Sequence, residues 1–189
     1  MKITEISTVL AKLFNSEEIQ HDVEEAWQIK NEQIDLLVLL SEDRTWLRLL
    51  TPIAAAREAQ SLLPQLLEDN FAATQEVRYA LDRDVLWGVY HHRLETLVPE
   101  DLEGAIASLQ FLKTKGLSNS FNKVIEKQII QIVKAAKAQG QSLEATYQTI
   151  DRFYQEGIMG GIDQDPAQRE QFLAAWKMQL ERLWSEVEV

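Results

Sequence analysis

The sequence predicts an α+β fold in which helices lie on one face of an antiparallel β-sheet, followed by about three C-terminal helices. Apolar residues recur at three- and four-residue spacing at the start of the chain, alternate with polar residues in its middle, and return to helical spacing towards its end. The predicted order is α-β-β-β-α-β-β-α, which suits a single antiparallel sheet better than repeated βα units.

The first predicted elements are a helix and three strands. The helix ends near Asn15, and one side of it is apolar through Ile3, Ile6, Leu10, Leu13 and Phe14. Alternation begins at Val23, and two further strands are predicted at 34–40 and 46–50, joined by a turn at 41–43. The strand at 34–40 is apolar on both sides, so both faces of the sheet need cover.

A second helix is predicted over 54–71, after Pro52 stops the third strand. Pro64 lies inside it, so the helix either kinks there or restarts as two pieces. A hairpin follows, with alternating apolar residues on both sides of a polar turn at 82–84. The next helix begins at Pro99, with acidic residues in its first turn.

The orientation of Trp87 in this hairpin decides what it contacts. We expect Trp87 to face the core, because Val85 and Val89 share its face whereas Gly88 and His92 lie on the other. The alternative is that it faces a dimer or client surface. Replacing it with alanine distinguishes a core tryptophan from an interface one.

The pattern breaks at 116–120, which predicts an α+β domain over residues 1–117 and a helical extension over residues 118–189, packed on or beside it. Within the extension, apolar stripes predict helices that run from 121 to Gly140, over 143–154 and over 166–187, with a loop at 157–161.

Composition narrows the possible functions. The 189-residue chain has a net charge of −11 and no cysteine, which excludes disulfides, thiolate metal sites and a cysteine nucleophile. The charge disfavours nucleic acid, and residues 1–118 carry most of it, with 11 basic and 20 acidic residues. The sequence has neither a membrane-spanning run nor the features of a signal peptide, so we expect a cytoplasmic protein without membrane or nucleic-acid partners.

We expect no catalytic, cofactor or metal site. His91 and His92 are adjacent in a strand, so they point to opposite faces and cannot ligate one ion together. Asp163 and Asp165 resemble the start of a calcium loop, but the later glycine and glutamate are missing. Glycine-rich phosphate loops and nucleophile elbows are also absent from the sequence, so we expect a protein that is not an enzyme.

The segment 66–109 carries a family resemblance. The matching positions are Leu66, Leu67, Asn70 and Phe71, then Ala80, Leu81 and Asp82, then Leu86, Trp87 and Leu97, and finally Leu102, Glu103 and Ile106. In this order the chain resembles the class I type III secretion chaperones and the YbjN-type domains over about its first 115 residues. It departs from them in its polar Asp-Arg-Asp turn and in its long C-terminal extension.

The resemblance implies a non-enzymatic, chaperone-like or adaptor module that holds a client polypeptide on an apolar surface and forms a homodimer. It implies client contacts at Trp27, Ile29, Trp46 and Leu49. It implies a dimer surface at Leu62, Leu66, Val85 and Trp87. The alternative is a structural or regulatory protein whose C-terminal helices cap the sheet, with a small-molecule or partner site between the two parts.

Overall fold

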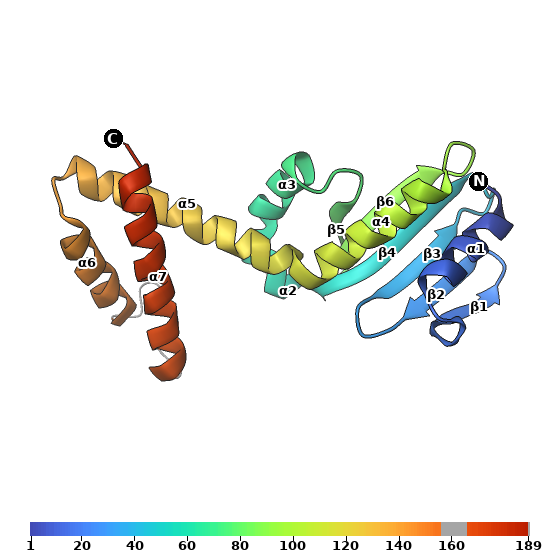
Figure 1. The fold of residues 1–189 in the computed structure, drawn as a ribbon, viewed down its shortest axis with the longest axis horizontal. Helices are drawn as coiled ribbons and strands as arrows, with labels where there is room; N and C mark the ends of the chain where they lie inside the picture. Colours follow the sequence, from blue (N-terminus) through green and yellow to red (C-terminus); the bar gives the residue numbers. More distant parts are fainter. Residues whose placement is uncertain (156–165, 189) are drawn as a thin grey trace. The chain divides into compact units, whose positions relative to one another are not determined.

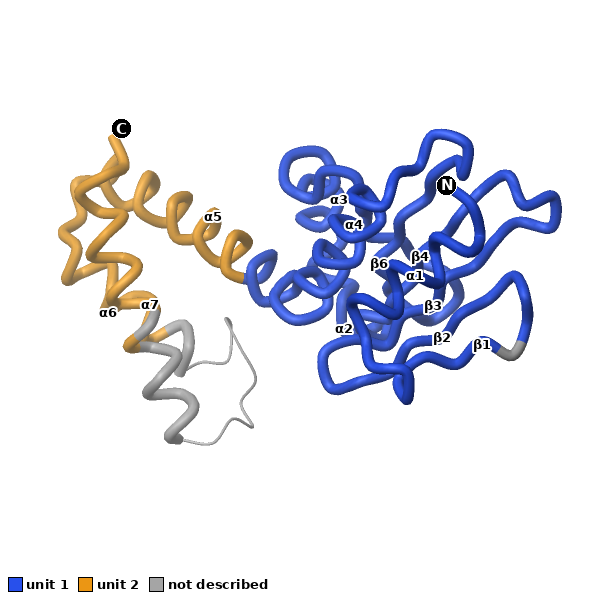
Figure 2. Tube along the Cα trace, turned by 45° about the vertical axis from the view of Figure 1, so that its right-hand side comes forward, with its two compact units in different colours: residues 1–121 blue, residues 122–189 orange. Residues whose placement is uncertain are grey.

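The computed structural model describes the backbone of residues 1–155 and 166–188, which fall into two compact units, residues 1–121 and residues 122–189 (Figure 2). The first unit contains the β-sheet, and the second contains α-helices. The predicted fold class, an antiparallel sheet with helices and then a helical C-terminal part, is confirmed.

The first unit begins with α1 (Ile3–Leu13), η1 (Ser16–Glu18), β1 (Ile19–Val23), β2 (Ala26–Lys30), β3 (Asp35–Leu40) and β4 (Trp46–Ala55). It continues with α2 (Ala56–Ala59), η2 (Gln60–Leu62), α3 (Leu63–Ala72), β5 (Arg78–Asp82), β6 (Val85–Arg93) and α4 (Pro99–Phe111). The strands form one antiparallel sheet in the order β1-β2-β3-β4-β6-β5. Strand β1 is an edge strand that the sequence did not predict, because its residues IQHDV show little apolar alternation.

Helices α1 and α4 pack on one face of this sheet (Figure 1). Every second residue of the central strands points into this core. The buried set includes Trp27, Ile29, Leu36, Val38, Leu47, Leu49, Leu86 and Tyr90 from the strands, Ile6 and Leu10 from α1, and Leu102, Ile106 and Leu109 from α4. The indole Nε1 of Trp27 donates a hydrogen bond to Ser7 Oγ at 3.2 Å, which ties β2 to α1.

The two prolines behave differently. Pro64 lies in the first turn of α3, where a missing N–H costs nothing, and the helix restarts there as the sequence allowed. Pro52 does not end its strand, because β4 continues to Ala55. The register shifts between Pro52 and Ala54, and such an irregularity accommodates a residue that cannot donate to the ladder. The expectation that Pro52 stops the strand is therefore wrong.

The hairpin of β5 and β6 turns at Arg83 and Asp84, as predicted, with Arg83 at φ 53°. Asn70 fixes the approach of α3 to this hairpin. The backbone N–H of Tyr79 donates to Asn70 Oδ1 at 2.7 Å, and Asn70 Nδ2 donates to the Tyr79 carbonyl at 3.1 Å. One amide thus replaces two ladder hydrogen bonds of this edge strand.

The helix does not end at 116–120, where the apolar pattern breaks and a domain boundary is predicted. Helix α4 continues through a π-helical turn, η3 (Leu112–Gly116), into α5 (Leu117–Ala138). Gly116 is there because a Cβ at this position would lie 2.2 Å from the hydroxyl oxygen of Tyr79. Ser120 is buried and donates to Asp69 Oδ2 at 2.6 Å. The small and polar residues of this segment therefore make close contacts inside a continuous helix, and the two units meet within α5.

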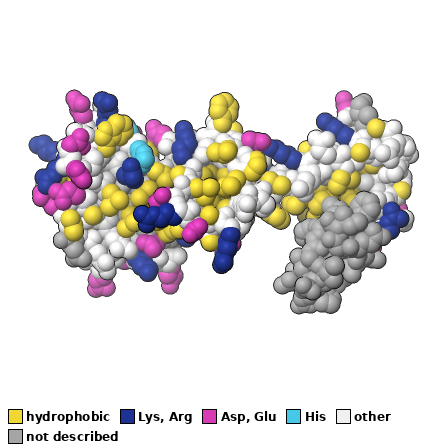
Figure 3. Space-filling view, turned by 180° about the vertical axis from the view of Figure 1, so that it is seen from behind, with side chains coloured by type: hydrophobic (Ala, Val, Ile, Leu, Met, Phe, Trp, Pro, Cys, Tyr) yellow, Lys and Arg dark blue, Asp and Glu magenta, His cyan; other side chains and the backbone are white. Residues whose placement is uncertain are grey.

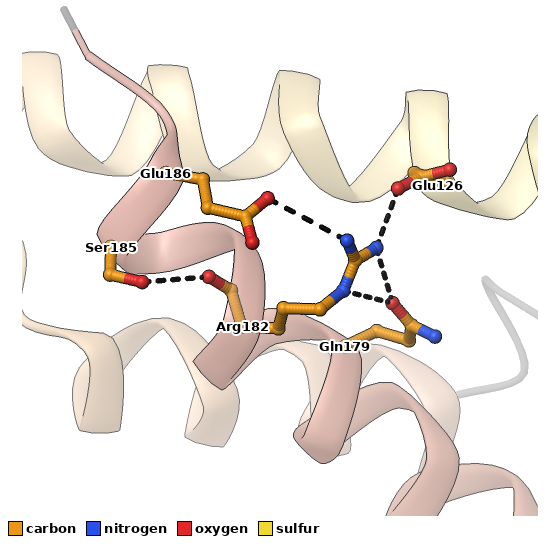
Figure 4. Close-up of polar contacts among 5 residues, drawn as sticks. All are labelled: Glu126, Gln179, Arg182, Ser185 and Glu186. Carbon is orange, nitrogen blue, oxygen red and sulfur yellow. Dashed lines mark hydrogen bonds and ion pairs between the residues drawn. The ribbon is translucent and has the colours of Figure 1, made fainter.

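The second unit contains most of α5, together with α6 (Leu143–Gln155) and α7 (Pro166–Glu186), as predicted. Its core consists of Ile129, Val133, Ile150, Trp176, Leu180 and Leu183. Arg182 of α7 donates to Glu126 of α5 at 2.5 Å and to Gln179 at 2.9 Å (Figure 4). Gly140, at φ +68°, follows the end of α5. The predicted loop at 157–161 and the aspartates at 163 and 165 lie outside the described residues.

Candidate functional site

The sheet face opposite α1 and α4, called the open face below, carries apolar side chains that are only partly buried. It comprises Leu37, Leu39, Trp46, Arg48, Leu50, Pro52, Val85, Trp87, Val89 and His91, all half-buried or exposed. Seen from behind in Figure 3, hydrophobic side chains reach the surface with both basic and acidic side chains among them. The open face is therefore the candidate binding surface of the first unit.

The register of the strands gathers these side chains into a band. Leu50 of β4 lies between Leu37 of β3 and Val89 of β6, and Pro52 lies opposite Trp87. Directly opposed residues have Cβ atoms about 4.5–5.5 Å apart, so these side chains touch across strands. The band is thus continuous over three strands.

Trp87 lies on the open face, half-buried, and the expectation that it faces the core is wrong. Its indole Nε1 is enclosed without a hydrogen-bond partner among the described residues. The core face of β6 instead carries Leu86, Gly88 and Tyr90. Gly88 marks this face because α4 packs closely there: a Cβ on Gly88 would lie 3.0 Å from Leu109.

The predicted client contacts separate into two groups. Trp27, Ile29 and Leu49 are 1%, 0% and 0% exposed, so they form the core and are not accessible on this unit. They occupy the alternate strand positions whose side chains point towards α1 and α4. Trp46 is 43% exposed and lies on the open face, and it alone of the four is available to a partner.

The predicted dimer residues also separate. Leu62 and Leu66 are buried within their own chain, so the prediction is wrong for them. Val85 and Trp87 lie half-buried on the open face. The exposed side of α3 carries Leu67 and Phe71 instead, 67% and 96% exposed and one helical turn apart, called the α3 ridge below. The four-residue spacing of Leu67 and Phe71 is visible in the sequence. It did not identify the ridge, because Leu66 and Leu67 both fit a broad apolar stripe and the sequence does not show which of them is buried.

The histidines are arranged as the alternation predicted. His91 points to the open face beside Arg48, whereas His92 stacks on Tyr90 with ring centroids 5.8 Å apart. Partial burial and the charge of Arg48 lower the pKa of His91. Within the part of the chain that the structure describes, no three histidine or acidic residues converge as metal ligands.

One end of the open face is hollowed on both sides of Trp46. A hollow of about 680 Å³ is lined by Leu39, Leu40, Ser41, Glu42, Trp46, Leu47, Arg48 and His91. A second, of about 420 Å³, is lined by Arg44, Thr45, Trp46, Arg93, Leu94 and Glu95. The exposed indole is therefore the wall between two depressions.

None of the helices described here has the length and apolar character required to cross a bilayer. No protein-family model matches the sequence. No curated protein matches it either.

Solved structures do resemble this chain. The ExoU–SpcU complex from the type III secretion system of Pseudomonas aeruginosa gives a TM-score of 0.49 at 16% identity over 60% of this chain and 95% of that one. The Yersinia pestis secretion chaperone SycH, solved with a YscM2 fragment, gives 0.43 at 14% identity over 56% and 91%. YbjN from E. coli gives 0.48 at 11% identity over 63% and 93%. The predicted resemblance is confirmed, and it concerns the fold alone.

Proposed function

We propose that this chain is a non-enzymatic protein-binding module that holds a partner polypeptide on its open face. The observation that carries the proposal is the band formed by Leu37, Leu50 and Val89, which lie side by side on three adjacent strands and are all only partly buried. Burying apolar side chains of a sheet face under a further layer is favourable, because it removes their surface from water.

The arrangement suits a polypeptide better than a small molecule. The band is continuous across β3, β4 and β6, and Trp87 and the leucines offer a broad apolar contact area. Small-molecule sites also have a few polar groups that point to one place, and the band has none. Trp46 and Trp87 are the largest side chains on the open face, and aromatic side chains often anchor protein interfaces.

The test is a photo-crosslinking amino acid placed at Leu50 in the full chain, with a control placed at Lys12 of α1, whose side chain is 66% exposed. Irradiation in native cell extract should give products with partner polypeptides from position 50 and not from position 12. A crosslink from position 50 into residues 122–189 of the same chain would contradict the proposal and favour the alternative, in which the C-terminal helices cap the sheet.

We further propose that the chain forms a homodimer through the α3 ridge. Phe71 is 96% exposed and Leu67 is 67% exposed, whereas their helix neighbours Leu66 and Asp69 are buried. A helix with apolar residues on both its inner and outer sides has a second surface to cover, and a two-fold axis lets one ridge cover its copy.

Sedimentation tests the dimer. The full chain should sediment at twice its 21.7 kDa, and Phe71→Glu should sediment at 21.7 kDa. Phe111→Glu is the matched control, because Phe111 is also an exposed phenylalanine, at 54%, but lies on α4. If the wild type has the mass of one chain at tens of micromolar, the dimer is excluded, and the proposal for the open face is unaffected.

A further inference from the structure

Charge on the open face is opposite in sign to the charge of the chain. The positions of β2 to β6 on this side of the sheet include charged residues beyond the ten named above. They carry four basic residues, Lys30, Arg48, Arg78 and Arg93, and two acidic residues, Asp35 and Asp82. Residues 1–118 as a whole carry 11 basic and 20 acidic residues. These strand positions are thus basic on balance, in a unit that is acidic as a whole.

The basic groups gather around Trp46. In the register, Trp46 lies opposite Arg93, and Arg48 lies opposite His91. The guanidinium carbon of Arg93 is 5.3 Å from the centroid of the Trp46 ring. Two arginines and a histidine therefore share one end of the face with the most exposed tryptophan of the sheet.

These arginines lack anionic partners. Among the described residues, neither Arg48 nor Arg93 has a carboxylate within ion-pair distance, whereas Arg44 in the nearby turn pairs with Glu24 at 2.8 Å and Glu25 at 2.5 Å. The acidic residues that the structure describes thus pair with Arg44 but not with Arg48 or Arg93, so these two arginines can bind an anion from a partner.

The two hollows beside Trp46 have the right lining for such an occupant. The larger combines Leu39 and the indole with Arg48 and His91, and only Glu42 contributes a carboxylate. The smaller combines the indole with Arg93 and contains Glu95. Each hollow therefore offers an apolar wall and a cation within the space of one or two residues of a bound chain.

We propose that the Trp46 end of the open face binds an acidic segment of the partner polypeptide, whose carboxylates contact Arg48 and Arg93 while an adjacent apolar side chain packs on Trp46 and Leu39. This rests on the proposed function and names the chemistry of its partner. Nucleic acid is a poorer occupant, because the net charge of the whole chain, −11, repels a long run of phosphates.

The experiment uses three fluorescein-labelled amphipathic peptides of identical length and apolar sequence, with glutamate, glutamine or lysine at every polar position. Fluorescence anisotropy measures their binding to the full chain, to Arg48→Gln/Arg93→Gln, to Leu50→Asp and to Lys30→Gln. Lys30 is the matched control, because it lies on the same face beside Asp35, at the end of β2 remote from Ala26 and Leu39.

The wild type should prefer the glutamate peptide to the lysine peptide by about ten-fold or more, and the preference should shrink as salt rises. The double arginine variant should lose this preference, and Lys30→Gln should keep it. Leu50→Asp should weaken the binding of all three peptides. If all three peptides bind the wild type equally through Leu50, the charge proposal fails and the protein-binding function stands. If no peptide binds the wild type, both fail.

Discussion

Leu49 and Leu50 are neighbours in β4 with opposite surroundings, so replacing each with alanine tests the assignment of the two faces. Leu49 is 0% exposed beneath the helices, whereas Leu50 is half-buried in the open face. The same three carbon atoms are removed in both variants, one residue apart on one strand. Differences in strand propensity and in the unfolded chain therefore cancel.

The magnitudes follow from the two environments. Removing three fully buried carbons loses about 2.4 kcal/mol of transfer free energy, and a cavity adds to it, so Leu49→Ala should cost about 3–5 kcal/mol. Leu50 loses only part of this transfer free energy, and water can enter the space left behind, so Leu50→Ala should cost about 1 kcal/mol. The expected difference is at least about 2 kcal/mol.

Hydrogen exchange followed by mass spectrometry is the suitable assay, because the chain has two compact units and a whole-chain melting curve need not be two-state. The free energy of opening is compared for amides of β3 and β4 in both variants. Equal destabilisation would refute the reasoning, since Leu50 would then be enclosed as fully as Leu49. A stable Leu50→Ala variant that no longer binds the partner identified by crosslinking from position 50 would support the open face as a binding surface.

Three further predictions concern the first unit. Gly116→Ala should destabilise it by about 1–3 kcal/mol, because its Cβ would lie 2.2 Å from the Tyr79 hydroxyl, whereas Gly104→Ala, with nothing within 4 Å, should stabilise α4 by up to about 1 kcal/mol in urea unfolding. Adding Tyr79→Phe should recover part of the Gly116→Ala loss, and no recovery would place the strain elsewhere. Ser120→Ala should cost about 1–3 kcal/mol by removing its hydrogen bond to buried Asp69, and an unchanged stability would deny that this bond contributes. Burial raises the pKa of Tyr90 from 10 to about 12, so the neutral phenol is favoured in the fold: stability should hold below pH 10 and fall between pH 10 and 12, and Tyr90→Phe should reduce that fall.

Strong periodicity made most of the elements predictable. The helical stripes of the second unit and the alternation around the 82–84 turn each had enough apolar residues to set a period. The restart at Pro64 followed from the stereochemistry of proline alone. Strand β1 had no such signal, since a polar edge strand is held by its ladder to β2.

The candidate site was less predictable, because alternation shows that a strand has two faces without showing which face a helix will cover. Gly88 looked like the solvent side of β6, but it is where Leu109 of α4 approaches the sheet. Because of this ambiguity alone, Trp87 was predicted to face the core. Trp27, Ile29 and Leu49 were assigned to a partner for the same reason, since large apolar residues serve a core and an interface equally well.

The π-helical turn η3 has a consequence for how this chain tolerates changes in length. A π-helix closes its hydrogen bonds between residues i and i+5, so one turn of it holds about one residue more than a turn of an α-helix. Removing one residue within 112–116 would let this turn close as an ordinary α-helix, and Ser120 would still face the buried carboxyl of Asp69. The turn therefore absorbs a change in chain length that, in a regular α-helix, would rotate every following residue by about 100°.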